Sequence, residues 1–332
     1  MTSTLRPMNL GEILDRTFQI YRSKFLGFAG IAALPALAMF GIHLAELRWL
    51  HGAWTIHLSH QWVGLWNLFV YVGLSHVASF LGILFFPAQV HLASTASLGE
   101  GSSISTALRF LVARWRTYLW VAILKFLVVL VIPEILFLTL ALGMALIGVL
   151  VGVVGGGPEM GANVVLLIVG FPAIAGFALF LWLVGCISLV VPACAIEGIG
   201  GGNAFRRSWA LSKGSRARII LSWLMIAVFS WLLIFGVELA FRWAFQYLCR
   251  AHFLGALARD FYSPAVYLLF AAVSALIGPV YPIAITLFYY DQRIRHEGYD
   301  IERMMEEAGM TAPATPPGGD GFIAPVAEDI EA

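Results

Sequence analysis

Six long apolar stretches constrain the fold of this chain more than any other feature. They lie near residues 25–45, 65–91, 118–154, 163–196, 217–247 and 262–290. An α-helix needs about 20 mostly apolar residues to cross the ~30 Å hydrocarbon core of a bilayer. Charged residues make up only 12% of the sequence, whereas about 25% is usual in soluble domains. The sequence therefore predicts an all-α, polytopic membrane protein with about six transmembrane helices.

The third and fourth stretches are longer than one perpendicular crossing requires. Tilt, a kink or an extension beyond the bilayer can absorb the excess residues. Dividing the third stretch at Pro133–Glu134 gives an eight-span alternative, but both pieces are then short for full crossings. We therefore favour six spans and leave open whether the third is one long helix or two segments.

The basic residues are distributed unequally between the two sides of these spans. Lys125 lies inside a span, and most of the other Lys and Arg residues flank the spans on one side. The opposite side carries only Arg48, Arg242, Arg250 and Arg259. Cytoplasmic loops are enriched in Lys and Arg, so both termini are predicted to be cytoplasmic. An amphipathic segment rather than a long apolar one follows the first residues, so we expect no cleavable signal peptide.

Three segments on the predicted cytoplasmic side resemble one another: residues 12–25, 106–119 and 203–216. Without gaps, the alignment matches Leu14 with Leu108 and Phe205, Phe18 with Val112 and Trp209, and Arg22 with Arg116 and Lys213. Each segment leads into an odd-numbered span, and each even-numbered span nears its end at a proline, namely Pro87, Pro192 or Pro282. The pattern predicts three units of amphipathic helix plus hairpin, with approximate ranges 8–93, 103–197 and 203–292.

These units and a short cytoplasmic helix form one predicted membrane domain, residues 1–308. Residues 309–332 are rich in Pro and Gly and lack an apolar period, so we predict a disordered cytoplasmic tail. In the first unit, apolar residues recur at steps of three and four from Leu10 to Phe25, as on one face of a helix. Asn9 followed by Glu12 is typical of a helix N-terminus with a capping box.

A helix with one basic and one apolar face can lie in the headgroup layer and attract anionic lipid. The basic residues predicted to contact headgroups or a partner protein are Arg16, Arg22, Arg109, Arg116, Arg206, Arg207 and Lys213. The positive-inside rule would also place a basic helix before any span. The internal repeat therefore remains one of two interpretations.

Four sequence segments resemble a bacterial family described as the membrane domain of glycerophosphoryl diester phosphodiesterase. They are residues 6–22 (RPMNLGEILDRTFQIYR), 191–200 (VPACAIEGIG), 204–209 (AFRRSW) and 287–295 (LFYYDQRIR). The resemblance implies a membrane fold in the bacterial inner membrane. A catalytic barrel of about 250 residues follows the membrane part in the family's namesake. Only residues 291–332 follow the last predicted span here, so the phosphodiesterase activity is not carried over.

Glu134 and Pro133 are the candidate functional residues inside the membrane. An ionisable residue within a span usually faces a cavity or a partner, and Pro133 can kink the helix beside it. The two interpretations are a proton or cation pathway and a hydrogen-bonded structural carboxyl group. Lys125 lies about 13 Å away along the helix axis, too far for a direct pair, so we expect it to reach the cytoplasmic interface.

The other polar residues are predicted to have structural roles. Glu238 and Arg242 are four residues apart and are predicted to form a structural ion pair. The histidines around His57 and His60 lack further ligands in the sequence, so we expect no metal site. Cys186, Cys194 and Cys249 lack metal or redox spacing and are predicted to be buried thiols; they are the chain's 3 cysteines.

No catalytic or nucleotide-binding motif is present in the sequence, and the net charge of +1 does not favour a nucleic-acid partner. We therefore expect a non-enzymatic protein without a cofactor, in contact with anionic headgroups and an unidentified membrane protein. Its predicted role is that of a scaffold or accessory subunit. The alternative is a small-solute or lipid transporter that uses the proline-kinked interior and Glu134.

Overall fold

The computed structural model describes residues 6–50, 60–99, 101, 103–153, 158–250, 258–307 and 310. The predicted tail (except Met310), His51, His57 and the glycines at 155–157 lie outside these residues. The described helices are α1 (Leu10–Ser23), α2 (Phe25–Leu50), α3 (His60–Ser97), α4 (Ile104–Ala113), α5 (Trp115–Phe126), a π-helical turn η1 (Leu127–Val131), α6 (Ile132–Val153), α7 (Pro158–Ile187), α8 (Val190–Glu197), α9 (Gly201–Ser212), α10 (Arg216–Arg250), α11 (Ala258–Ile277), α12 (Val280–Glu297) and α13 (Tyr299–Glu307).

Six helical segments are long and apolar enough to cross a membrane, as the sequence predicts. They are Phe25–Leu47, Val72–Ser97, Trp115–Ile147, Gly170–Glu197, Arg216–Arg250 and Phe261–Glu297. The third is a single run through α5, η1 and α6 rather than two crossings. The protein is therefore an all-α, multi-pass membrane protein.

Two of the even-numbered spans are interrupted by a turn shortly before their prolines, whereas Pro87 lies inside an unbroken α3. A turn at residues 188–189 separates α7 from α8, just before Pro192, and a turn at 278–279 separates α11 from α12. At the second turn, a Cβ on Gly278 would lie 2.7 Å from the Ser274 carbonyl oxygen. Only glycine fits this close approach of backbone atoms without a shift.

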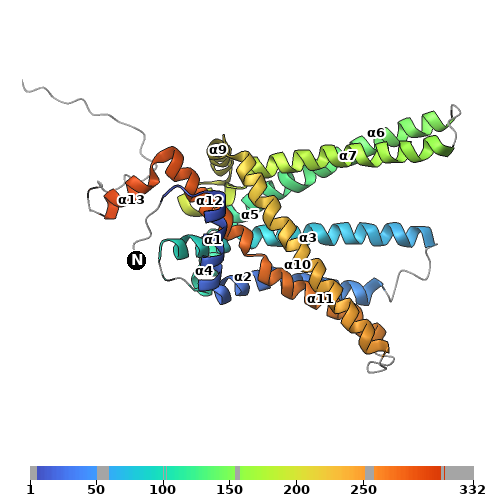
Figure 1. The fold of residues 1–332 in the computed structure, drawn as a ribbon, viewed down its shortest axis with the longest axis horizontal. Coiled ribbons are helices and arrows are strands. Elements are labelled where there is room, and N and C mark those ends of the chain that lie inside the picture. Colours follow the sequence, from blue (N-terminus) through green and yellow to red (C-terminus); the bar gives the residue numbers. More distant parts are fainter. Residues whose placement is uncertain are drawn as a thin grey trace, which may run out of the picture.

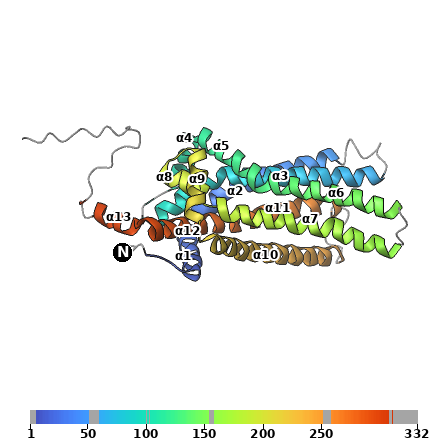
Figure 2. The same ribbon diagram turned by 90° about the horizontal axis from the view of Figure 1, so that it is seen from above.

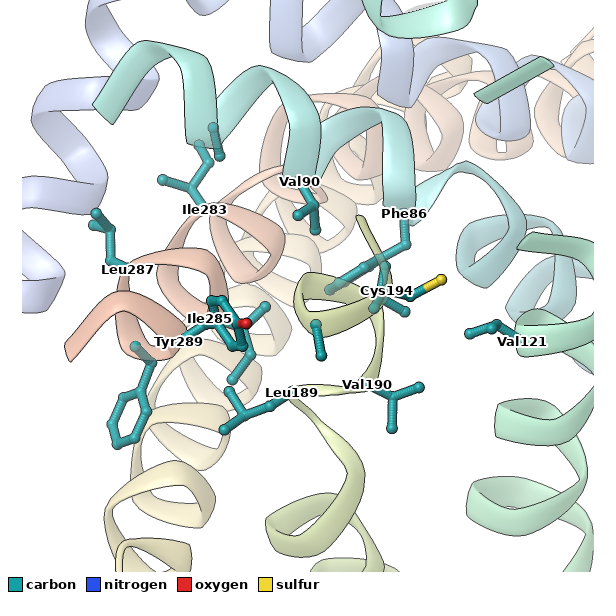
Figure 3. Close-up of a cluster of buried hydrophobic side chains, with 14 of the residues drawn as sticks. Phe86, Val90, Val121, Leu189, Val190, Cys194, Ile283, Ile285, Leu287 and Tyr289 are labelled. Atoms are coloured by element: carbon teal, nitrogen blue, oxygen red, sulfur yellow. The ribbon is translucent and has the colours of Figure 1, made fainter. Parts of the chain in front are cut away.

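Helix α12 forms the centre of the bundle at one end. Residues 282–292 are all buried, as expected for a helix with neighbours on every side. It packs against α1, α3, α8, α9 and α10. Figure 3 shows side chains from α3, α5, α8 and α12 in this core, including Val90, Val121, Cys194, Ile285 and Tyr289. The core therefore joins all three predicted units.

The three short helices α1, α4 and α9 lie at this same end, together with the first described residues and α13 (Figures 1 and 2). We call it the basic end, because it carries the predicted interface residues. Each short helix immediately precedes an odd-numbered span: α1 precedes α2, α4 precedes α5 and α9 precedes α10. The first described residues and α13 share one end, as an even number of crossings requires.

Burial along the short helices follows the ungapped alignment of the three segments. The aligned residues Ile13, Ala107 and Ala204 are buried, and so are Thr17, Leu111 and Ser208. The next aligned set is exposed in each helix: Phe18 by 47%, Val112 by 65% and Trp209 by 43%. Each helix is thus fixed to the core by one face and presents an apolar residue outward on another.

This burial differs in two respects from the sequence-based prediction. The apolar period puts Ile13 and Phe18 on one face of α1, whereas in the structure Ile13, Thr17 and Ile20 face the core and Phe18 points outward. The alignment also places Arg116 on a short helix, but α4 ends at Ala113 and α5 begins at Trp115, so Arg116 lies on α5. The apolar period identifies the apolar face of a helix. How much of that face is buried depends on the helices that pack against it.

The predicted capping box at the start of α1 is present. The Asn9 side chain accepts a 2.8 Å hydrogen bond from the Glu12 amide, and the Glu12 carboxylate accepts one of 2.8 Å from the Asn9 amide. Hydrogen bonds from Asn9 and Arg6 lower the pKa of Glu12. Loss of such a cap costs about 1 kcal/mol.

We therefore expect Asn9→Ala to lower the stability of the protein by about 1 kcal/mol through loss of the cap on α1. Thermal unfolding in detergent measures this effect, and Asn9→Ser, which keeps a capping oxygen, is the matched control. A midpoint that falls equally in both variants would contradict a capping role for Asn9.

Candidate functional site

A buried carboxylate on α12 holds the chain segment before α1. Asp291 is 0% exposed. It accepts hydrogen bonds of 2.8 Å from the Met8 amide, 3.0 Å from Arg295 Nε and 3.0 Å from the Gln292 amide group. Arg218 Nη1 lies 3.5 Å from it. These contacts neutralise the charge of Asp291 inside the core.

The same two arginines also bind the carbonyl of Met8. Arg295 donates to the Met8 oxygen at 2.8 Å and Arg218 at 3.1 Å. Helices α10 and α12 are therefore connected to the chain just before α1 through the backbone amide and carbonyl of Met8. We call Asp291, Arg295, Arg218 and Met8 the N-terminal clasp.

A second ionic cluster joins α8, α9 and α12. Arg207 donates to Glu197 through Nε at 2.9 Å and Nη2 at 2.7 Å, and to Glu297 at 2.7 Å. Tyr289 donates its hydroxyl hydrogen to Glu197, and Arg293 donates to Glu297 at 3.1 Å. Burial disfavours the charged form of Arg207, but its bonds to Glu297 and Glu197 outweigh this and raise its pKa.

Arg207 therefore differs from the other residues predicted to contact lipid or a partner. Its guanidinium group is committed to carboxylates within the protein. The sequence gives only the faces of α9 and does not show that Arg207 binds these carboxylates. Glu297 is 90 residues away along the chain, so sequence spacing gave no sign of the pair.

The four segments that carry the family resemblance meet in these two clusters. Residues 6–22 contribute Met8, residues 287–295 contribute Asp291, residues 191–200 contribute Glu197 and residues 204–209 contribute Arg207. These contacts of Met8, Asp291, Glu197 and Arg207 hold helices together.

Six predicted interface residues remain at the surface of the basic end: Arg16, Arg22, Arg109, Arg116, Arg206 and Lys213. Within the described ranges, none of them forms an ion pair with a carboxylate. Arg16 donates to the Gln19 side chain at 3.4 Å, and Arg116 lies 5.6 Å from the centre of the Trp115 ring. Exposed Trp115 and Trp120 lie on the same segment. Unpaired cations beside aromatic side chains suit the headgroup layer.

Inside the membrane region, Glu134 pairs with a histidine from another span. Its carboxylate lies 2.7 Å from Nε2 of His76 on α3, and the other ring nitrogen of His76 lies 2.7 Å from the Val72 carbonyl oxygen. The side chains remain 37% and 28% exposed. The sequence analysis singled out Glu134 but missed His76, 58 residues earlier, because no local pattern connects the two.

Pro133 follows the π-helical turn η1 and is the second residue of α6. A proline cannot donate a backbone hydrogen bond to the preceding turn, and π-turns widen a helix where its regular bonding is interrupted. Across the interface with α7, a Cβ on Gly176 would lie 3.2 Å from the Pro133 carbonyl oxygen. The interrupted segment is therefore closely packed on that side, and neither of the two described cavities includes Pro133 or Glu134.

Lys125 does not reach the interface, in contrast to the sequence-based expectation. It is only 8% exposed, and its Nζ lies 4.6 Å from the centre of the Phe86 ring. Gln89 Oε1 on α3 and the Tyr118 hydroxyl on α5 are also buried, and neither has a hydrogen-bond partner among the described residues. The sequence analysis treated Lys125 as snorkelling because it could not locate the contact between α3 and α5.

Other polar side chains form local contacts or are buried. Arg242 donates to Glu238 at 3.0 Å, and both side chains are exposed. His43 forms a contact of 3.2 Å with Glu46 that the sequence analysis did not find. Cys186 and Cys194 are buried, and Cys249 is half-buried. Among the described residues, no group of three or more potential ligands could hold a metal ion.

Comparisons with known proteins add no identification. No protein-family model, curated protein or solved structure matches this chain. The resemblance described above therefore stays a prediction, and the function has to be argued from the geometry of the basic end and of the Glu134 pair.

Proposed function

We propose that this chain is a non-enzymatic scaffold or accessory subunit of the bacterial inner membrane. Its basic end faces the cytoplasm and presents α1, α4 and α9 to anionic headgroups and to a membrane protein partner. The proposal rests on one observation: each short helix is fixed to the core and carries an exposed apolar residue and an outward, unpaired cation. Such a surface is suited to binding at an interface.

The distribution of basic residues supports the cytoplasmic orientation. Among the described residues, most unpaired cations lie at the basic end, whereas the opposite end of α10 carries Arg242, which is paired with Glu238, and Arg250. Basic residues are retained on the cytoplasmic side of membrane proteins. Both termini would then lie in the cytoplasm, because the first described residues and α13 lie at that end.

Photocrosslinking in native membranes tests the presentation of this surface. With a photoreactive residue in place of Val112, we expect a discrete protein adduct that weakens when Arg116→Glu removes the adjacent cation. Leu142, exposed on α6, is the control position and should give only lipid adducts. Identical adducts at both positions, or a Val112 adduct insensitive to Arg116→Glu, would contradict the proposal.

A second candidate function is transport, supported by the His76–Glu134 pair. A histidine bonded to a carboxylate inside a span can exchange a proton, as in the relays of transporters. The pair would link α3 to α6 next to the π-helical turn, where the helix is already interrupted. We rank this role second because neither described cavity reaches the pair.

Proton flux into liposomes distinguishes the two functions. The scaffold proposal predicts no flux above that of empty vesicles, and equal values for the wild type and Glu134→Gln. Glu238→Gln is the matched control, since it neutralises another carboxylate near a span. Flux that disappears in Glu134→Gln but persists in Glu238→Gln would replace the scaffold by a transporter.

A further inference from the structure

A cavity of about 710 Å³ opens where α1 meets α2 at the basic end. This volume lies within the range of small-molecule sites. The residues that line it include the basic residues Arg22 and Lys24 and the start of α4. None of the lining residues is acidic, and within the described part of the chain neither cation forms an ion pair. The cavity is therefore positively charged without an internal counter-charge.

Polar groups continue on the wall opposite the two cations. Ser103 and Ser105 line the cavity, and their hydroxyl oxygens lie 2.8 Å apart. They belong to the cap and first turn of α4, a 10-residue helix. Amides in the first turn of a helix lack intrahelical acceptors and favour an anion. The cavity is thus lined by two basic residues, two serines and the start of a helix.

The remaining wall of the cavity is apolar and continues into the membrane span. Phe25, Leu26 and Leu92 line it. Leu26 is 78% exposed and is the second residue of the span Phe25–Leu47. The chain breaks from α1 into α2 at Lys24, so the cations lie where the apolar span begins. A ligand in the cavity would meet positive charge at one end and the lipid-facing side of α2 at the other.

We propose that this cavity binds the phosphate group of an anionic phospholipid, with the acyl chains along α2 beside Leu26. The inference rests on the proposed function, because it takes the basic end to face a lipid leaflet. The two cations and the two hydroxyls favour a phosphate group. The apolar wall favours a ligand with acyl chains embedded in the membrane. A soluble phosphate would satisfy the cations but leave Leu26 without a role.

Titration of the purified full-length chain in nonionic detergent with phosphatidylglycerol tests this site. Detergent removes the membrane surface potential, so diffuse attraction to other cations does not contribute. Native mass spectrometry should show one tightly bound lipid per chain. Arg22→Gln combined with Lys24→Gln is expected to raise the dissociation constant about 30-fold, the effect of two cations near a phosphate.

Three further variants separate the site from general charge. Arg242→Gln with Arg250→Gln removes two exposed cations at the opposite end of α10 and should change the dissociation constant by less than about threefold. Arg22→Lys keeps the charge and should retain binding. Ser105→Trp fills the cavity without a change of charge and should weaken binding as strongly as the double variant. Wild-type thermal midpoints in these variants show that the fold is intact.

Several outcomes would overturn the inference. Equal losses in the two double variants would show diffuse attraction in place of a site. Full binding in Ser105→Trp would show that the cavity is not occupied. Inorganic phosphate that displaces phosphatidylglycerol at equal concentration would show a soluble ligand instead of a lipid. In each case, a Val112 crosslink that depends on Arg116 would leave the proposed scaffold role standing.

Discussion

Replacing Asp291 with alanine is expected to lower the free energy of unfolding by about 3 kcal/mol. The substitution removes a fully buried carboxylate and leaves Arg295, Arg218 and the Met8 amide without their acceptor. Removal of one partner from a buried ionic cluster costs about 3 to 5 kcal/mol. We place the effect at the lower end because the two arginines are about one third exposed and regain some hydration.

Thermal unfolding in detergent measures this loss, and limited proteolysis near Met8 shows whether the N-terminal clasp has opened. The matched control is Glu238→Ala, which removes the carboxylate of an exposed pair and should cost less than about 1 kcal/mol. Equal losses in the two variants would show that the clasp contributes no more than a surface ion pair does.

The second large effect is expected for Phe288→Ala in the central helix. Phe288 is 1% exposed and packs within the core that joins α3, α8 and α12. Truncation of a buried phenylalanine costs about 3 to 5 kcal/mol, since it removes apolar contacts and leaves a cavity. A loss of this size would lower the thermal midpoint strongly or prevent accumulation of the protein in the membrane.

Phe235→Ala provides the matched comparison, because Phe235 is 50% exposed on α10. The same chemical change there leaves no enclosed cavity and should have little effect on stability. If Phe235→Ala destabilised the protein as much as Phe288→Ala, α12 would not be the centre of the bundle.

The spans could be predicted from the sequence because each depends on its own residues. Length and apolar content fix whether a segment can cross a bilayer, so six spans followed from composition along the chain. The capping box of Asn9 and Glu12 is equally local, and it is present in the structure. The ungapped alignment also matched Phe18, Val112 and Trp209, and all three are exposed in the structure.

Contacts between distant segments could not be predicted in the same way. Residues 282–292 form a fully buried helix, but their apolar run also fits the end of a simple span. The His76–Glu134 pair and the burial of Lys125 against Phe86 depend on how α3 packs against its neighbours. A single sequence gives the faces of each helix, but it does not give the rotation of one helix against another.

The candidate interface could likewise be predicted only in part. A count of basic residues correctly marked the basic end as the charged end of the bundle, but it could not separate paired from unpaired cations. Arg207 binds Glu197 and Glu297, whereas Arg22 lines a cavity without an acidic residue. Which cations are available to lipid therefore depends on the tertiary structure.

Thiol labelling in spheroplasts is the most direct test of the central claim that the basic end faces the cytoplasm. Cys249 lies at the end of α10 opposite the basic end, and Cys186 and Cys194 are buried. A membrane-impermeant maleimide should label Cys249 in intact spheroplasts. In a Cys249→Ala background, it should label Gln19→Cys on α1 only after permeabilisation. Labelling of Gln19→Cys in intact spheroplasts, with Cys249 protected, would contradict the proposed orientation and the headgroup-binding role that depends on it.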